Sequence, residues 1–182
     1  KTMTYPVTVQ AAYDASNLYV RLTFKAPAGG FDHSDKDNEL KATVMFPNDK
    51  VPLADQAGCW AACHDDAKGM PKGKEKTKYV TAGAMDLMQW KSSGKSADGF
   101  VADKRNMEGG KAGATAEGAK AGDTYTVTFT RKLAGNAVLA AGKAVPFGIA
   151  IHADNAAGRF HHVSFGHTIG LGADGDVKAA KQ

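Results

Sequence analysis

The stretch of sequence at residues 18–25 reads LYVRLTFK, and it decides the fold class. Leu18, Val20, Leu22 and Phe24 fall on one side of an extended chain, and the residues between them fall on the other side. Alternation with a period of two residues is typical of a strand that buries one face of a sheet. We therefore predict a half-buried β-strand over this stretch.

The same alternation recurs along most of the chain, whereas helical periodicity is scarce. We predict about seven strands, most of them joined by turns rich in Gly, Asn, Asp and Pro. The other apolar faces are Tyr5-Val7-Val9-Ala11, Ala42-Val44-Phe46, Tyr125-Val127-Phe129, Phe147-Ile149-Ile151 and a last one of His161, Val163, Phe165, His167, Ile169 and Leu171. The pattern predicts one domain over residues 1–182, an all-β, immunoglobulin-like antiparallel sandwich with a few short helices and long loops.

Two stretches interrupt the alternation, at about residues 51–78 and 91–122. Structureless loops of this length are uncommon in compact domains and are usually functional or mobile. We expect the first stretch to surround a bound group, because it holds both cysteines. The second is rich in Gly, Ala and Lys, and we expect a mobile surface excursion there, with packing against the domain as the alternative for residues 99–106.

The composition excludes several classes of protein. The chain of 182 residues has a formal charge of +4, but its lysines lie in Gly/Ala-rich stretches and form no basic stripe interleaved with aromatic residues, so nucleic-acid binding is not expected. No window approaches the roughly 20 apolar residues that span a bilayer. The residues after Lys1 lack the regions of a signal peptide, so either an export signal has been removed or the chain is a domain cut from a longer, membrane-anchored protein.

Both cysteines lie in one motif, CWAACH at residues 59–64. The spacing Cys-x-x-Cys-His attaches a c-type haem, whose vinyl groups form thioethers with Cys59 and Cys63 while His64 becomes the proximal iron ligand. This motif has three residues between the cysteines, and one of them can be looped out. Two alternatives stay open on spacing alone. One is a zinc site completed by other histidines, and the other is a local Cys59–Cys63 disulfide.

The order of several motifs resembles the haem-binding domain of the ethylbenzene dehydrogenase and dimethyl-sulfide dehydrogenase gamma-subunit family. The resemblance covers about residues 5–172 and is carried by AAYD at 11–14, LYVRLTF at 18–24, ATVMFP at 42–47, DLMQWK at 86–91 and GRFHHVS at 158–164. It implies a β-sandwich that holds one haem at the edge of its sheets. Some members are electron-transfer subunits of molybdenum enzymes, and others carry a cysteine–histidine motif and accompany membrane-bound cytochromes.

The chain departs from the dehydrogenase subunits at both axial positions. Those subunits bind haem b through a methionine and a lysine. This chain has the motif at 59–64 in place of the methionine, and His161-His162 in place of the lysine. The resemblance therefore implies one covalent haem c with histidine on each side of the iron, and a non-covalent haem b stays open as the alternative.

We expect His64 as the proximal ligand and His161 as the distal ligand, with His162 as the alternative. In an extended chain, residues an even number of positions apart point to the same side. His161 therefore has the parity of Ile169 and Leu171, which alternation predicts to be buried, whereas His162 points to the other side. Met85, Met88 and Met107 are rival sixth ligands, although buried methionines mostly fill core gaps.

Other side chains are candidates for contacts with the haem. The resemblance places Trp90 on or near it, with core packing as the alternative reading. Arg105, Lys91 and Arg159 could hold the propionates by charge-assisted hydrogen bonds, with solvated surface charge as the alternative. His152 ends a predicted strand on its polar side and is a further candidate for a propionate.

We predict a periplasmic monohaem cytochrome that carries single electrons between redox proteins, such as other cytochromes or quinol-linked and molybdenum oxidoreductases. No nucleophile elbow, phosphate loop or carboxylate pair indicates an enzyme. Two alternatives stay open. One is a haem-carrying subunit of a molybdenum oxidoreductase complex, and the other is a haem-based sensor with a displaceable distal ligand.

Overall fold

The computed structural model describes residues 4–26, 39–59, 83–152 and 161–182. Within these ranges twelve strands hydrogen-bond into one sheet, beside the short helix α1 (Ala54–Ala57). The prediction of an all-β fold is confirmed, with more strands than the alternation had indicated. In chain order the strands are β1 (Thr8–Tyr13), β2 (Asn17–Lys25), β3 (Lys41–Pro47), β4 (Met85–Lys91), β5 (Ser96–Val101), β6 (Arg105–Asn106), β7 (Thr115–Ala121), β8 (Thr124–Lys132), β9 (Lys143–His152), β10 (His162–Val163), β11 (His167–Leu171) and β12 (Val177–Lys181).

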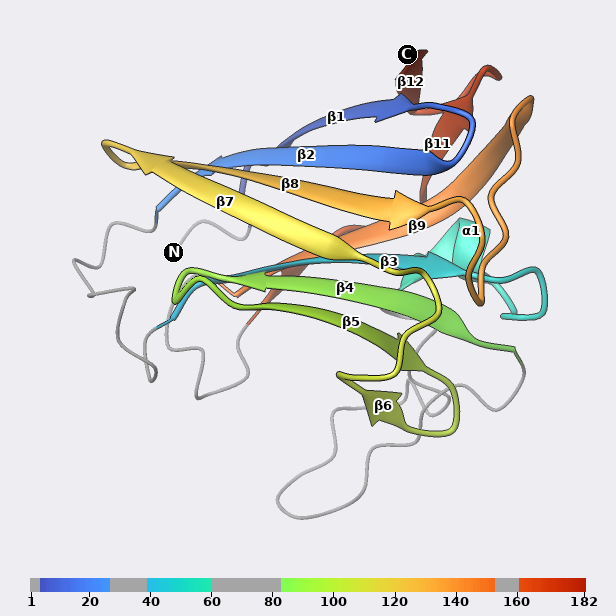
Figure 1. The fold of residues 1–182 in the computed structure, drawn as a ribbon, viewed down its shortest axis with the longest axis horizontal. Helices are drawn as coiled ribbons and strands as arrows, with labels where there is room; N and C mark the ends of the chain where they lie inside the picture. The colour runs from blue at the N-terminus through green and yellow to red at the C-terminus, as the bar shows by residue number, and fades with distance from the viewer. Residues whose placement is uncertain (1–3, 27–38, 60–82, 153–160) are drawn as a thin grey trace.

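The sheet curls until its two ends face each other as layers (Figure 1). Its order is β6-β5-β4-β3-β9-β11-β12-β1-β2-β8-β7, and β10 pairs with β9 outside this path. Strands β1, β2, β8 and β7 form one layer, and β9, β3, β4 and β5 form the other (Figure 1). Most neighbours are antiparallel, as expected, but β12 pairs in parallel with both β1 and β11, so the sheet is mixed at the junction of the layers.

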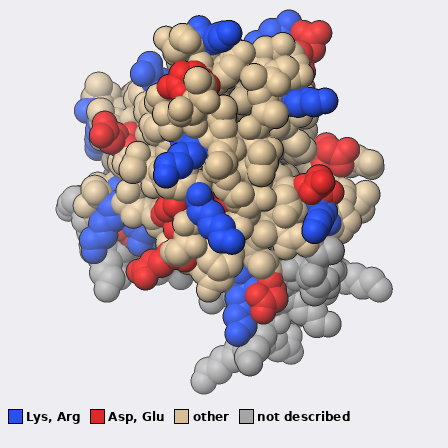
Figure 2. Space-filling model, turned by 45° about the vertical axis from the view of Figure 1, so that its right-hand side comes forward, with Lys and Arg blue, Asp and Glu red and all other residues tan. Residues whose placement is uncertain are grey.

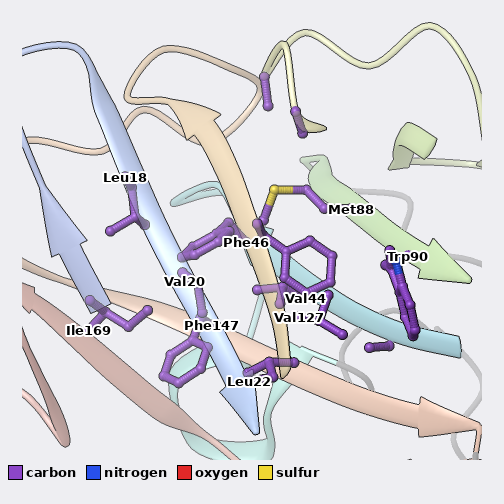
Figure 3. Packing of buried hydrophobic residues seen from close by; sticks show 14 of the residues in the cluster. Leu18, Val20, Leu22, Val44, Phe46, Met88, Trp90, Val127, Phe147 and Ile169 are labelled. Carbon is purple, nitrogen blue, oxygen red and sulfur yellow. The ribbon is translucent and has the colours of Figure 1, made fainter. Parts of the chain in front are cut away.

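The main core fills the space between the two layers (Figure 3). The alternating residues of 18–25 point into it, since Leu18, Val20 and Leu22 have no exposed surface. Phe46 of β3 and Phe147 of β9 meet them from the opposite layer, with ring centroids 6.3 Å apart. Burying a large apolar side chain contributes about 1.5–3 kcal/mol, so this core stabilises the whole sandwich. Its members include Leu18, Val20, Leu22, Phe24, Ala42, Val44, Phe46, Met88, Trp90, Tyr125, Val127, Phe129, Phe147, Ile151, Ile169 and Leu171.

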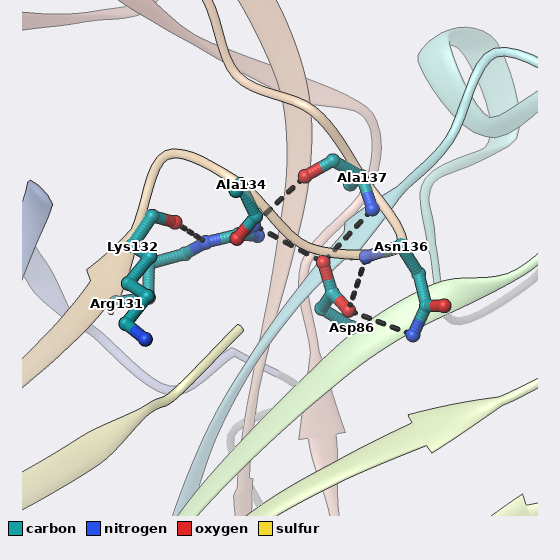
Figure 4. A network of polar contacts seen from close by, with 6 residues as sticks. All are labelled: Asp86, Arg131, Lys132, Ala134, Asn136 and Ala137. Atoms are coloured by element: carbon teal, nitrogen blue, oxygen red, sulfur yellow. Dashed lines mark hydrogen bonds and ion pairs between the residues drawn. The ribbon is translucent and has the colours of Figure 1, made fainter. Parts of the chain in front are cut away.

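One buried ion pair joins the layers inside this core (Figure 4). The Nη2 of Arg131 on β8 lies 3.1 Å from the Oδ2 of Asp86 on β4, and neither side chain is exposed. Asp86 also accepts hydrogen bonds from the backbone N–H groups of Asn136 and Ala137, at 3.0 and 2.9 Å. Burial lowers the pKa of Arg131, and the carboxylate of Asp86 opposes that shift. The pair therefore fastens the loop after β8 to the opposite layer.

The expected excursion at residues 91–122 is wrong, because that stretch contains β5, β6 and β7. Strand β7 is mostly exposed and lies at the edge of the sheet, so it has no apolar face for alternation to reveal. A Cβ on its Gly118 would lie 2.3 Å from the Trp90 ring, so only glycine lets the strand approach that ring. An edge strand of this composition resembles a loop in sequence.

The single apolar face expected over residues 161–171 is also wrong in part. The stretch is divided into β10 and β11, which are separated at residues 164–166. Ile169 and Leu171 are buried as expected, whereas Val163 and Phe165 are 44% and 79% exposed. The interruption arises because this segment packs against the short helix α1, as described below.

Candidate functional site

The layer of β9, β3, β4 and β5 has a second face, which points away from the main core. Strand pairing places Thr43 opposite Gln89 and Ala150, and Met45 opposite Leu87 and Gly148, and paired residues project to the same side. We call this the outer face. Its members on the four strands are Lys41, Thr43, Met45, Met85, Leu87, Gln89, Lys91, Ala97, Gly99, Val101, Gly148, Ala150 and His152.

Small side chains line much of the outer face, at Gly99 on β5 and at Gly148 and Ala150 on β9. A cavity of about 450 Å³ lies at the β5 edge of the layer, and it is lined by Gln89, Lys91, residues 95–98 and residues 107–109. No three His, Cys, Asp or Glu side chains of the described ranges gather as a metal-binding group.

Cys59 is buried on this outer face. It packs with Met45, Met85 and Leu87 in a second apolar cluster, separate from the main core, whose other members are Val51, Ala54 and Val101. The first cysteine of the CWAACH motif thus points at the strands. Cys63 and His64 lie outside the described residues, as do Arg159 and most of the 51–78 stretch.

The position of Cys59 is fixed by a close backbone contact. Gly58 has a φ of 90°, and a Cβ on it would lie 2.8 Å from the carbonyl carbon of Phe165. In return, a Cβ on Gly166 would lie 2.5 Å from the carbonyl oxygen of Asp55 in α1. Two glycines therefore let the cysteine motif and the segment after β10 lie against each other.

The two histidine candidates lie on opposite sides of the sheet. His162 pairs with Ile151, a member of the main core, while Val163 pairs with Ala150 of the outer face. His162 is exposed and stacks on Tyr5, with ring centroids 5.0 Å apart. His161 has the opposite parity, is half-buried, and lies on the side of Cys59.

His161 stacks on His152, which ends β9. Their ring centroids are 4.9 Å apart and the rings are inclined by 29°. Burial, followed by the positive charges of His161, Lys41 and Arg105, lowers the pKa of His152 to about 4. The imidazole is therefore neutral at pH 7, and its buried Nδ1 has no hydrogen-bond partner among the described residues. The contact with His161 depends on the pairing of β9 with β10, which residue order alone does not reveal.

The remaining candidates divide between the two faces. Trp90 lies in the main core, where its ring meets Tyr125 edge-on at 5.9 Å, so the structure does not bring it to Cys59. Met88 also lies in the main core, whereas Met85 belongs to the second cluster and Met107 packs against it. Arg105 is exposed and pairs with Val101, which places it on the side of the outer face.

These residues fit a covalently bound haem. A buried thiol, a half-buried imidazole and small side chains share one face. A buried imidazole nitrogen without a partner and nearby cations suit a ligand that carries carboxylates. The structure places Cys59 and His161 on one side of the sheet, and the haem roles expected of them stay predictions.

Comparison with known proteins gives concordant results. The model of the ethylbenzene dehydrogenase family matches residues 1–122. Cytochrome c-551 of Rhodocyclus tenuis is 52% identical over 184 residues, covering 100% of this chain and 71% of that protein. Cytochrome c-552 of Stutzerimonas stutzeri is 49% identical over 187 residues, covering 96% of this chain and 64% of that protein. The chain thus spans only part of the length of these relatives.

Proposed function

This chain belongs to the ethylbenzene dehydrogenase family, and we propose that it is a c-type cytochrome domain that carries single electrons between redox proteins. The observation that carries the proposal is that Cys59 and His161 lie on the same side of the sheet, where Cys59 packs on Met45 and His161 stacks on His152. The names of two relatives about half identical in sequence support it. A bound haem supplies an iron that alternates between Fe(III) and Fe(II).

The attachment and ligation follow from the motif and from the outer face. Cys59 and Cys63 form the two thioethers and hold one haem, His64 is the proximal ligand, and His161 is the distal ligand. His161 is favoured over His162 because only His161 has the parity of the face on which Cys59 is buried. An imidazole on each side leaves no open coordination position, so the protein transfers electrons rather than transforming a bound substrate.

The protein sets the properties of the site through its own side chains. Met45, Met85 and Leu87 surround Cys59 with apolar atoms, which exclude water and lower the local dielectric constant. The stack of His152 on His161 restricts the orientation of the distal imidazole. Bis-histidine ligation in such a pocket gives a lower reduction potential than ligation by histidine and methionine.

We place the protein in the periplasm, because c-type haem is attached on that side of the bacterial inner membrane. In the described part of the chain, no helix is long and apolar enough to cross a membrane. The redox partners are other cytochromes or quinol-linked and molybdenum oxidoreductases. The domain also fits a longer, membrane-anchored protein.

A second candidate function is a haem-carrying subunit of a molybdenum oxidoreductase complex. It is favoured by apolar side chains near Cys59, since Leu53 before α1 and Phe165 beside Gly58 are 60% and 79% exposed. Exposed apolar residues close to a functional site mark surfaces for protein contact. Elsewhere the surface is mixed, because acidic and basic side chains are interspersed over the face seen in Figure 2. Co-purification with a molybdenum subunit supports this candidate, and a monodisperse, electron-transferring single chain opposes it.

The test uses protein expressed in a periplasm with the haem attachment machinery. A pyridine haemochrome spectrum after acid-acetone extraction shows whether the haem is covalent. The wild-type protein is expected to show the spectrum of six-coordinate, low-spin iron. The His161→Ala variant is expected to lose that spectrum and to bind carbon monoxide when it is reduced. The matched control is His162→Ala, which leaves the spectrum unchanged. Extractable haem contradicts the attachment, and the reverse behaviour of the two variants contradicts the ligand assignment.

A further inference from the structure

Three charged side chains meet at the end of the outer face farthest from Cys59. The carboxylate of Glu39, just before β3, lies 3.3 Å from the Nζ of Lys41 and 3.1 Å from the Nζ of Lys91. The hydroxyl of Ser93 donates a further hydrogen bond of 2.8 Å to Glu39. The Glu39 side chain is only 6% exposed, and the lysines are 22% and 31% exposed, so this cluster is partly withdrawn from water. We call Glu39, Lys41 and Lys91 the charged end.

The charged end carries an excess of positive charge. Burial raises the pKa of Glu39, but Ser93, Lys91 and Lys41 together hold it below its usual value, so Glu39 is ionised at pH 7. One carboxylate therefore balances two ammonium groups. Arg105 adds a third cation whose field reaches His152. Half-buried cations in excess of their partners favour an anionic ligand.

His152 lies beside this cluster, and its Nδ1 has no hydrogen-bond partner in the described part of the chain. It stands directly opposite Lys41 in the pairing of β9 with β3. A buried ring nitrogen without a partner in a native structure calls for an explanation. An Nδ1–H group next to ammonium groups is suited to a carboxylate, which accepts hydrogen bonds from both.

The charged end and the thiol are separated along one strand. Cys59 packs on Met45, which is four residues from Lys41 on β3, so the separation is about 13 Å at the rise of an extended strand. This length is comparable to that of a porphyrin from its vinyl side to its carboxylate side.

We propose that Lys41, Lys91 and the Nδ1–H of His152 bind the propionate carboxylates of the haem, with Glu39 as a fixed counter-charge. This inference rests on the proposed function. It assigns an orientation in which the carboxylate side of the haem faces the charged end and the vinyl side faces Cys59. The ionised groups then act on the iron through their charge, without coordinating it.

The test is a set of charge changes measured by reduction potential in the haem-loaded protein. Lys41→Met removes a positive charge and is expected to lower the potential, because Fe(III) is then stabilised relative to Fe(II). Glu39→Gln removes a negative charge and is expected to raise it. Lys41→Arg keeps the charge and restores the wild-type value. Lys178→Met, at an exposed lysine on β12 paired with Asp174, is the matched control and leaves the potential unchanged. A purely structural role for the cluster would not shift the potential in opposite directions.

A second readout follows the carboxylates themselves. Resonance Raman spectra are expected to show a shifted propionate bending mode in His152→Leu and in Lys41→Met, with low-spin iron retained. Unchanged potentials and propionate modes in a protein that still carries low-spin covalent haem overturn this inference and leave the proposed function standing. High-spin iron in His152→Leu overturns the assignment of His152, since the residue then acts through His161. Absence of haem from the wild-type protein removes the proposed function, and this inference with it.

Discussion

The two sides of the β9-β3-β4-β5 layer are built from the same strands but from different chemistry. The side that faces the main core carries large apolar side chains such as Val44 and Phe46, which have no exposed surface. The outer face carries Cys59 and methionines, small residues and ionisable groups, and Met45 of β3 lies on this side. Strand β3 is therefore buried at nearly every position, which is unusual for a strand of an antiparallel pair. One side stabilises the fold, and the other carries the residues of the proposed site.

The two sides differ in how far their residues satisfy one another. The main core closes on itself through apolar side chains from both layers. The second cluster has few apolar members, and it is extended by polar groups such as His152 and Glu39, which need specific partners. Mutations on the two sides should thus separate stability from redox properties.

The largest effect is expected from Asp86→Ala. This change leaves the buried Arg131 guanidinium without its counter-charge and removes the hydrogen bonds that Asp86 accepts from Asn136 and Ala137. We expect the free energy of unfolding to fall by about 5 kcal/mol, measured by denaturant titration of the haem-loaded protein. Asp174→Ala breaks an exposed, solvent-screened ion pair and should leave the free energy of unfolding nearly unchanged. Equal losses in the two variants would show that the buried pair does not join the layers.

The next largest effect is expected from substitutions at Met45 and Phe46, which are neighbours on β3 and point to opposite sides of the layer. Phe46→Ala leaves a cavity in the main core and should lower the free energy of unfolding by about 3–5 kcal/mol. The reduction potential should not change. Met45→Leu on the outer face nearly conserves volume and should cost less than about 1.5 kcal/mol, yet it should shift the potential because Met45 lies against Cys59. Both quantities are measured on the same preparations. If Phe46→Ala shifted the reduction potential and Met45→Leu did not, the two sides would not divide stability from redox properties as we expect.

A smaller effect is expected where the cysteine motif contacts the segment after β10. Gly58→Ala introduces a Cβ into a conformation with a φ of 90° and against the backbone of Phe165, so we expect a loss of about 3 kcal/mol. Gly94→Ala is the matched control, since Gly94 has a φ of 84° but nothing within 4 Å of the added Cβ, and it should cost about 1–2 kcal/mol. The difference in unfolding free energy isolates the contact. No difference would mean that the contact does not position Cys59.

The sequence predicted the parts of the molecule where burial alternates. Strands β2 and β8 follow their sequence patterns along their whole length, because one side of each faces the main core. Strand β7 was missed because it is an edge strand with little to bury. The division of residues 161–171 was missed because it arises from contact with α1, a partner distant in sequence.

The candidate site was predictable only as far as its motifs. The cysteine motif and the parity of His161 are local signals. The charged end depends on pairing between β3, β4 and β9, and Lys41, Lys91 and Glu39 were not recognisable as one cluster before that register was known.

The smallest effect concerns the pH dependence that distinguishes the outer face from the main core. The folded protein holds the pKa of Glu39 below its usual value of 4.5, through Ser93, Lys91 and Lys41 against the effect of burial. A carboxyl group with a lowered pKa contributes stability that is fully present above the unfolded value and is lost as the pH falls through the folded value. Glu39→Gln should therefore cost about 1 kcal/mol at pH 7 and less at pH 3, as measured by denaturant titration at both values. The cost of Phe46→Ala, which involves no ionisable group, should be the same at both. A cost of Glu39→Gln that does not change with pH would mean that Glu39 acts through packing, and the charge on the outer face would then have no part in stabilising it.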